Sequence, residues 1–401
     1  MGGVSNIPGT ITRSSLGGTI SDISGSITNN GGFPILTPAY ISNLITYSQS
    51  GNLTYFDSTG TLQTAAVDVL PRDYDPSTLV LRGYPFWEQR TNLALWSRDA
   101  TNAAWTKTNA TATLTATGLT GVANSASVLS ATAADGLVYQ NITVSASTTY
   151  TFSVYLKASS ATTLTIFIFD PVFATLGSTV CNVTTSWQRF TVTAGTGVNT
   201  GIKISIGGGS TFSSGEVVTM DCVNFEAGAF ATPAILTTTA AVTRAAPSCA
   251  ITGTNFSSFW NAAQGSLYVA SLQSVTGSSA GLTAIEAGDG TNNNLIQIGT
   301  QFGATNFQAL VNAGGVGQAA FLQASATTLT KRAFAYAAND FAQSVNGAAV
   351  STDTSGTVPT VNQMGIGIRP NSQGSPLNGW VQNALYYSAR LPNSSLQTLS
   401  A

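Results

Sequence analysis

The chain of 401 residues is long enough for two or three domains, and its 43% hydrophobic content can fill sizeable cores. Only 7% of the residues are charged, against about 25% in ordinary soluble domains, and a net charge of −2 without a basic run excludes nucleic-acid binding through phosphate neutralisation. Because the chain has no histidine, Ser-His-Asp and Cys-His catalysis and imidazole-ligated metal sites are also excluded.

The apolar residues indicate a β-rich fold. No apolar run approaches the ~18 residues that a membrane-spanning helix requires, so we expect no membrane insertion. The 6 Trp, 12 Tyr and 18 Phe, together with many β-branched residues, argue against disorder. The first ten residues lack the charged and apolar regions of a secretory signal. Cys181, Cys222 and Cys249 are too few and too widely spaced for a disulfide framework or a zinc site, and we expect them to be small buried residues.

Residues 1–50 are rich in Gly, Ser, Thr and Asn, and no charge occurs between Ile23 and Phe56. This segment is too polar to form a core by itself, which leaves a flexible linker or an extended arm that packs only on a partner. The spacing of Ile20, Ile23 and Ile27 favours the attachment arm, because these side chains need a surface to bury them.

Residues 51–107 form a segment of different composition, with charges of both signs and several prolines that interrupt regular structure. The mixed signs predict local salt bridges that fix loops, so we interpret the segment as an adaptor. Within it we expect structural roles for Arg90, which would pair with a carboxylate such as Asp75, and for Asn92, which would cap a turn.

From residue 108 to about 244 the chain reads as strands. Tyr150–Lys157 has one apolar and one mostly polar face, as in a half-buried strand, and Leu164–Phe169 is apolar on both faces, as in a central strand. Other alternating runs are Gln188–Val192, Ile202–Ile206 and Val217–Phe225. Gly/Ser/Asn clusters separate these runs by roughly 8–15 residues, which predicts an antiparallel sandwich.

Residues 245–401 form a second block of strands. The predicted strands are Ser266–Leu272, Asn294–Ile298, Phe307–Val311, Arg332–Tyr336, Gln343–Val345 and Gly379–Tyr387. Asn346 and Gly347 predict a two-residue hairpin turn, and Asn393 and Ser394 are candidate caps for a short helix that closes the chain. The chain is therefore predicted to be all-β, with two tandem antiparallel β-sandwiches of jelly-roll type preceded by an extended arm.

Several short segments occur in the order that they have in a known family. These are Tyr55–Ala65, Pro71–Pro76, Glu88–Leu93, Asn102–Lys107, Tyr150–Lys157, Trp187–Thr193, Ala231–Pro233 and Val242–Ala246. The series resembles a module of bacteriophage tail and virion surface proteins, in which a Glu-x-Arg-Thr-Asn-Leu-Leu box opens a carbohydrate-binding-module-like β-sandwich. The chain departs from the family pattern at Gly83–Trp87 and at Leu93–Trp96.

The last block carries a second resemblance, to concanavalin-like or laminin-G-like jelly rolls. It rests on Gly265–Val269, Ser344–Gly347, Gly379–Trp380 and Tyr386–Leu391. Together the resemblances imply a structural protein of the virion surface, in a tail fibre, tail tip or head decoration, that recognises a host-surface glycan. They also imply docking on other virion proteins through the arm, and a homo-oligomer, most simply a trimer.

Sugar binding by a β-sandwich combines an exposed aromatic ring with Asn, Asp or Gln hydrogen bonds. Five aromatic residues of the second block are candidates for stacking on a sugar: Trp260, Tyr268, Trp380, Tyr386 and Tyr387. Core packing is the alternative for each of them. Trp105 and Trp187 are expected in the core, because each precedes a strand with a clear buried face.

Glu286, Asp289 and Asn292 lie in a Gly- and Asn-rich stretch that reads as a solvated hairpin loop. A calcium or sugar loop is the alternative, since Asp and Asn oxygens are ligands that Ca²⁺ prefers; no other cofactor is expected. The stretch lacks the Glu-x-Asp-x-x-Glu triplet of jelly-roll glucanases, so we predict no catalytic residues and no enzyme. Two alternatives remain: a virion-associated polysaccharide depolymerase, which needs paired carboxylates in a cleft, and a secreted lectin-like adhesin, which needs a secretion signal or an anchor.

Overall fold

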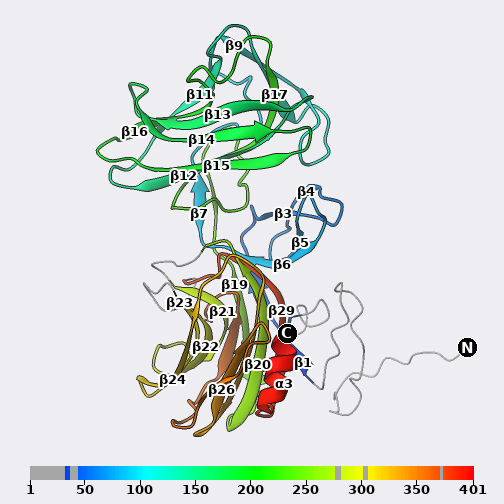
Figure 1. Ribbon diagram of the computed structural model, residues 1–401, viewed down its shortest axis with the longest axis vertical. Coiled ribbons are helices and arrows are strands. Elements are labelled where there is room, and N and C mark those ends of the chain that lie inside the picture. The colour runs from blue at the N-terminus through cyan, green and yellow to red at the C-terminus, as the bar shows by residue number, and fades with distance from the viewer. Residues whose placement is uncertain (1–31, 37–43, 276–280, 301–305, 371–373) are drawn as a thin grey trace, which may run out of the picture.

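The computed structural model describes residues 32–36, 44–275, 281–300, 306–370 and 374–401. Two β-sandwiches lie one above the other along the long axis of the molecule, with a smaller group of strands beside their junction (Figure 1). Apart from the short helices α2 (Gly253–Ser257) and α3 (Asn393–Ser400), the regular structure of these ranges is β. The predicted all-β fold with two antiparallel sandwiches is confirmed. No helix in the described ranges has the length and hydropathy to cross a membrane.

The first sandwich, at the top of Figure 1, consists of two five-stranded antiparallel sheets. One sheet has the strand order β15 (Gln188–Gly195), β12 (Thr149–Lys157), β17 (Val217–Ala227), β10 (Ala126–Ala131) and β9 (Ala110–Ala116). The other has the order β14 (Thr175–Val183), β13 (Thr162–Phe169), β16 (Gly201–Gly207), β11 (Leu137–Thr143) and β8 (Thr106–Thr108). Their facing sides bury a core that includes Trp105, Phe152 and Phe225.

The pattern of apolar and polar residues located five of the ten described strands of the first sandwich. The five predicted runs fall within β12, β13, β15, β16 and β17. β13 pairs with β14 on one side and with β16 on the other, so it is an interior strand, as its two apolar faces predict. Its inner face fills the core, and its outer face carries Phe167 and Phe169, whose ring centres lie 4.6 Å apart.

The second sandwich has larger sheets. One has the order β27 (Ser351–Asp353), β26 (Phe341–Val345), β25 (Thr330–Ala337), β20 (Gln264–Gln273), β29 (Gly379–Tyr387), β6 (Leu81–Phe86) and β5 (Asp73–Tyr74), with β1 (Phe33–Pro34) also paired to β29. The other has the order β2 (Thr46–Ser48), β19 (Ser248–Thr252), β28 (Gln363–Ile366), β21 (Leu282–Gly288), β22 (Leu295–Thr300), β23 (Asn306–Ala313) and β24 (Val316–Ala324). Asn346 and Gly347, at the turn after β26, have φ angles of 49° and 73°, as predicted for the hairpin.

Parts of the predicted N-terminal arm belong to the second sandwich. β1 pairs with β29, and β2 pairs with β19. Four apolar side chains of these segments are buried in the core between the two large sheets: Ile35, Leu36, Ile45 and Tyr47. The expectation of an arm that packs only on a partner is therefore wrong for these residues, because the chain's own sheets bury them. Residues 1–31 and 37–43 of the predicted arm lie outside the described residues.

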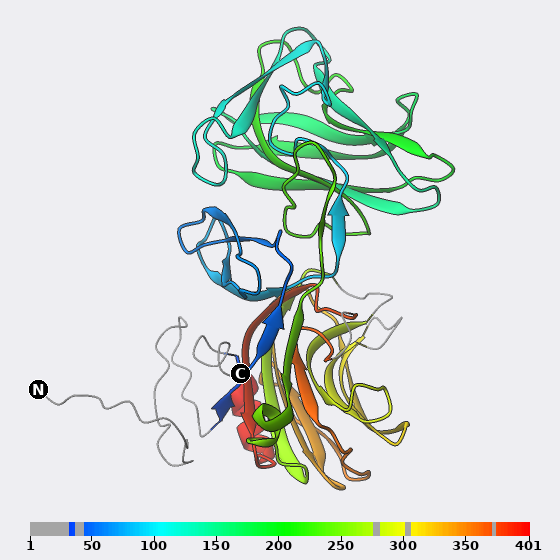
Figure 2. The ribbon, with the colours of Figure 1, turned by 180° about the vertical axis from the view of Figure 1, so that it is seen from behind.

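The first sandwich is an insertion in the second. β6 belongs to the larger sheet of the second sandwich, and the strand that follows it, β7 (Arg90–Asn92), pairs with β18 (Val242–Arg244). All ten strands of the first sandwich come between β7 and β18 in the sequence. The chain thus leaves the second sandwich through β7 and returns through β18 (Figure 2). The two paired strands β7 and β18 therefore join the sandwiches. The sequence analysis predicts instead that the second sandwich simply follows the first along the chain.

A small hairpin completes the junction. β3 (Thr54–Phe56) pairs with β4 (Leu62–Thr64), and Phe56 and Leu62 pack against Tyr155 on the outer face of the first sandwich. The Phe56 and Tyr155 rings meet edge-on with their centres 5.9 Å apart. The turn of the hairpin is held by Asp57, whose Oδ1 accepts hydrogen bonds from the backbone N–H groups of Thr59 and Thr61 at 2.9 and 3.1 Å. The hairpin therefore covers part of the sheet that contains β12.

The C-terminal helix α3 packs on the outer face of the larger sheet, where Leu396 is buried. The predicted capping by the Asn393 and Ser394 side chains is wrong. Pro392 is the N-cap residue, no side chain caps the helix, and the Pro392 carbonyl accepts the Leu396 N–H at 3.1 Å. The three cysteines are buried and unpaired, as expected.

Candidate functional site

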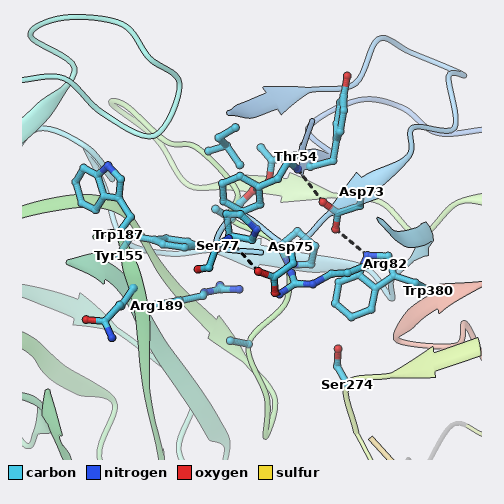
Figure 3. Close-up of a pocket in the computed structure, with 18 of the residues that line it drawn as sticks. Thr54, Asp73, Asp75, Ser77, Arg82, Tyr155, Trp187, Arg189, Ser274 and Trp380 are labelled. Atoms are coloured by element: carbon cyan, nitrogen blue, oxygen red, sulfur yellow. Dashed lines mark hydrogen bonds and ion pairs between the residues drawn. The ribbon is translucent and has the colours of Figure 1, made fainter. Parts of the chain in front are cut away.

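A pocket of about 410 Å³ opens at the junction of the two sandwiches (Figure 3). We call it the junction pocket. It is lined by β12 and the start of β15 of the first sandwich, the loop after β17, the segment from β3 to Trp87, Ser274, and Trp380 at the start of β29. Its polar and aromatic lining includes Asp73, Asp75, Arg82, Tyr155, Trp187, Gln188, Arg189 and Trp380.

The first sandwich contributes neighbouring side chains from two paired strands. Tyr155 of β12 lies directly opposite Arg189 of β15, and the guanidinium lies 5.5 Å from the centre of the tyrosine ring. Trp187, just before β15, is half-buried, and the ammonium group of Lys157 lies 4.6 Å from the centre of its ring. Because side chains two residues apart share one face of a strand, these four form one continuous surface of rings and cations.

The opposite side of the pocket comes from the turn that precedes β6. Asp75 Oδ1 accepts hydrogen bonds from the N–H groups of Ser77 and Thr78, each at 2.9 Å, and Oδ2 pairs with Arg82 at 2.7 Å. Burial opposes the charge of Asp75, but the two backbone hydrogen bonds and Arg82 outweigh it and lower the pKa of this carboxyl. The Asp75 and Arg82 side chains are 29% and 30% exposed, so the pair remains open to the solvent.

The most buried part of the lining joins the N-terminal segment to the last strand. The indole N–H of Trp380 donates to Asp73 Oδ2 at 2.7 Å, and the backbone N–H of Phe56 donates to Asp73 Oδ1 at 2.7 Å. Burial raises the pKa of Asp73 in spite of these hydrogen bonds. The Arg82 guanidinium lies 5.1 Å from the centre of the Trp380 ring, and Trp87 packs edge-on against it at 5.0 Å.

The structure buries four of the five aromatic residues predicted to stack on a sugar. Tyr268 and Tyr387 lie in the apolar cluster beneath α3, and Tyr386 is 1% exposed between the sheets. A buried ring has no free face, so the prediction is wrong for these three tyrosines. Trp260 is half-buried and stacks on Tyr386 at 5.0 Å. Trp380 is 8% exposed and lines the junction pocket.

The residues predicted as a calcium loop hold an arginine. Glu286 is fully buried and pairs with Arg369 at 2.9 Å, and Arg369 also donates to Asn292 Oδ1 at 2.6 Å. Asp289 accepts the Thr291 N–H of its own turn at 2.8 Å. The calcium prediction is wrong for this set. The Arg369 guanidinium lies between Glu286 and Asn292, where the prediction placed the calcium ion. The described part of the chain contains no group of three or more Cys, Asp or Glu side chains that could hold a metal.

Arg90 and Asp75 do not pair. Arg90 lies on β7 and pairs with Glu88, and its guanidinium lies 4.8 Å from the centre of the Phe230 ring. Asp75 lies in the turn before β6 and pairs with Arg82. The predicted contact is wrong because β7 runs toward the first sandwich, away from this turn.

Asn92 connects three segments of the chain. Its side-chain amide donates to the carbonyl groups of Val223 and Ile235 at 2.9 and 2.7 Å. Its Oδ1 accepts the N–H groups of Ala94 and Phe225 at 3.0 and 2.9 Å. The hydrogen bond from the Ala94 N–H closes a local turn. The other three connect β7 to β17 and to the segment around Ile235 that leads back to the second sandwich.

Sequence reasoning predicted Trp380 as a binding residue but missed most of the pocket lining, including Trp187, Arg189, Tyr155, Asp73 and Arg82. Trp187 is predicted to be a core residue, yet it is half-buried and lines the pocket. One signal was available: in the alternating run Gln188–Val192, Arg189 belongs to the polar face. The rest of the lining comes from residues 54–87 and from residues after 230, and no local pattern connects these segments to β15.

Comparisons with known proteins found no matching family model and no matching curated protein. Several solved structures are similar to parts of the chain. Three of them are a CBM4 module (19% identity, 27% of this chain and 74% of that chain, TM-score 0.24), domain 4 of the GH43 extracellular arabinanase AbnA from Geobacillus stearothermophilus, solved with arabinotriose (14% identity, 39% and 73%, TM-score 0.30), and the N-terminal CBM22-1–CBM22-2 tandem domain of Xyn10C from Paenibacillus barcinonensis (8% identity, 75% and 98%, TM-score 0.29). The chain itself is a double β-sandwich protein with one sandwich inserted in the other and a pocket at their junction.

Proposed function

We propose that this chain is a non-catalytic glycan-binding protein that holds a sugar in the junction pocket. The observation that carries the proposal is the half-buried Trp187 ring beside Arg189, with the Asp75–Arg82 pair on the other side of the pocket (Figure 3). A sugar ring has apolar C–H faces that pack on an aromatic ring, and hydroxyl groups at its rim that pair with charged and amide groups. The pocket offers both kinds of group together.

The size and rigidity of the pocket support this function. Its volume of about 410 Å³ lies in the ordinary range of small-ligand sites. Arg189 is held in place, because its Nη2 donates to Ser153 Oγ at 2.8 Å and to the Thr232 carbonyl at 2.6 Å. The turn at Asp75 is likewise fixed by hydrogen bonds. Groups that are already ordered lose little conformational entropy when a ligand binds.

Two carboxylates line the pocket, which is the feature that favours the alternative of a polysaccharide depolymerase. Both oxygens of Asp73 accept hydrogen bonds, from Phe56 and Trp380. Both oxygens of Asp75 also accept hydrogen bonds, from its own turn and from Arg82. These partners hold both carboxylates in the wall of the pocket, and we take them as support for a structural role of the two groups and for binding without hydrolysis.

We further propose that the chain is displayed on the surface of a bacteriophage virion, where it recognises a host-surface glycan. The sequence resemblance that runs from Tyr55 to Ala246 supports this location. Attachment to other virion proteins through the N-terminal residues and assembly as a trimer are parts of the same proposal. The secreted lectin-like adhesin remains the alternative location for the same binding activity.

The binding proposal is tested with the full chain on an array of neutral and acidic oligosaccharides. Trp187→Ala should lower the affinity for the best-bound sugar at least tenfold, because it removes the ring on which the sugar packs. Phe173→Ala is the matched control, since Phe173 is an aromatic residue that is 42% exposed elsewhere on the first sandwich. Equal binding by the wild type and Trp187→Ala would contradict the proposed site.

Two further measurements separate the alternatives. Immunogold electron microscopy with an antibody to the second sandwich should label virions, at the tail or over the shell, and particles without label would contradict the virion location. Incubation with the bound polysaccharide should release no reducing ends. Release that disappears in Asp73→Asn would instead support the depolymerase.

A further inference from the structure

Two cations of the first sandwich, Arg189 in the lining of the junction pocket and Lys157 beside Trp187, have no acidic partner among the described residues. Within the described part of the chain, no carboxylate oxygen lies within 4.0 Å of the Arg189 guanidinium or the Lys157 ammonium. Arg189 donates only to the neutral groups of Ser153 and Thr232. The two cations flank Tyr155 and Trp187, the rings on which we place the sugar.

The acidic groups of the pocket do not balance these charges. Asp75 is neutralised by Arg82 at 2.7 Å. Asp73 is 3% exposed, and its oxygens face the donors of Phe56 and Trp380. A ligand that enters the pocket therefore meets an excess of positive charge on the Trp187 side.

We propose that the glycan held in the junction pocket is acidic and that a sugar carboxylate pairs with Arg189, with Lys157 adding to the attraction. This inference rests on the proposed glycan-binding function and names its substrate class. A neutral sugar would leave the partly buried guanidinium without a counter-charge, whereas a carboxylate forms charge-assisted hydrogen bonds with it.

The hydrogen bonds of Arg189 indicate how it would bind the carboxylate. Ser153 and Thr232 hold Nη2 and so fix the plane of the guanidinium. Nε is buried without a hydrogen-bond partner, and Nη1 donates no hydrogen bond within the described ranges, so Nη1 is the donor left for a ligand. An arginine donor held in a fixed orientation and left without a partner is suited to pair with a carboxylate.

The test compares matched acidic and neutral sugars by isothermal titration with the full chain. The pairs are trigalacturonate and its methyl ester, hyaluronan tetrasaccharide and its carboxyl-reduced form, and 3′-sialyllactose and lactose. Dextran sulfate serves as a probe of charge alone. The variants are Arg189→Gln and, as a matched control, Lys331→Gln, which removes one positive charge from β25 of the other sandwich.

We expect the wild type and Lys331→Gln to bind at least one acidic sugar tenfold or more tightly than its neutral partner. In Arg189→Gln this preference should fall below about twofold, because the variant loses more affinity for the acidic sugar than for its neutral partner. Neutral sugars bound as tightly as acidic ones would overturn this inference and leave the proposed function standing, and so would dextran sulfate bound as tightly as the acidic sugars. The absence of binding to every sugar tested would contradict the proposed function itself.

Discussion

Trp380, on the last strand of the second sandwich, donates its indole N–H at 2.7 Å to Asp73, a residue 307 positions earlier in the chain. Asp73 also accepts the N–H of Phe56, whose ring packs on Tyr155 of the first sandwich. One buried carboxylate therefore links the small hairpin, which covers the first sandwich, to the second sandwich. Asp73 also lies in the wall of the junction pocket. Loss of its hydrogen bonds to Phe56 and Trp380 should therefore change the shape of the pocket.

Asp73→Ala should lower the free energy of unfolding by about 1–3 kcal/mol, because it leaves two buried N–H donors without an acceptor. The measurement is the denaturant midpoint of the full chain. Asp135→Ala is the control, since Asp135 is exposed and accepts a single loop hydrogen bond, from Ser210. Equal midpoints for the two variants would contradict the linking role of Asp73.

The hairpin turn at Asp57 should make part of the stability dependent on pH. Burial opposes the charge, but hydrogen bonds from Thr59, Gln63 and Thr61 lower the pKa of Asp57 from 3.8 to about 2. A lowered folded-state pKa means that this contribution is complete above about pH 4 and is lost as the pH falls to about 2. The difference in melting temperature between the wild type and Asp57→Ala should therefore shrink between pH 5 and pH 2.5. A constant difference would contradict this assignment.

Arg332 should lower the stability of the fold, and this effect should weaken as the pH rises. It is fully buried on β25, its three guanidinium nitrogens have no hydrogen-bond partner, and its charge lies 4.0 Å from the centre of the Phe307 ring. Burial lowers the pKa of Arg332 to about 9, so folding is penalised at neutral pH and the penalty declines as the pH rises through 9.

Arg332→Met should therefore stabilise the chain, by about 1–4 kcal/mol at pH 7, the range observed when buried ionic groups are replaced by apolar ones. Thermal unfolding at pH 7 and pH 10 is the measurement, and the gain should be smaller at pH 10. Lys331→Met, one position earlier on the same strand, should give no such gain. A destabilised Arg332→Met would mean that the charge has a role in the fold.

Asn92→Ala should destabilise the first sandwich, because four backbone groups of Ala94, Val223, Phe225 and Ile235 lose their partner inside the protein. We expect a loss of about 2 kcal/mol or more in chemical unfolding. Asn141→Ala, at an exposed position on β11, is the control and should change little. A small effect of Asn92→Ala would show that water replaces these hydrogen bonds.

The strands could be predicted from the sequence wherever one face is buried and the other is not. Tyr150–Lys157 alternates because β12 has a core face and an outer face, and the two apolar faces of Leu164–Phe169 reflect an interior strand. The strand pairs far apart in the sequence could not be predicted in this way. Ile35 and Tyr47 stand in short apolar stretches of a largely polar segment, and only the pairing of β1 and β2 with late strands explains their burial.

The candidate site was less predictable for the same reason. Tyr386 and Trp187 are both aromatic residues at the end of strand-like runs in the sequence or just before them, yet one lies between two sheets and the other lines a pocket. What separates them is which segments cover each ring, and for Trp187 these come from the first 90 residues and from the loop after β17. The composition of the sequence around a residue does not show which distant segments will pack over its side chain.

The central claim, that a glycan binds in the junction pocket, is tested most directly by hydrogen–deuterium exchange of the full chain with and without a saturating concentration of the sugar that binds most tightly on the array. The account predicts slower exchange at residues 185–190 and 73–82, the two sides of the pocket, and little change elsewhere. Exchange that slows only on the outer face of β13, around Phe167 and Phe169, would contradict it, and so would exchange that does not change at all.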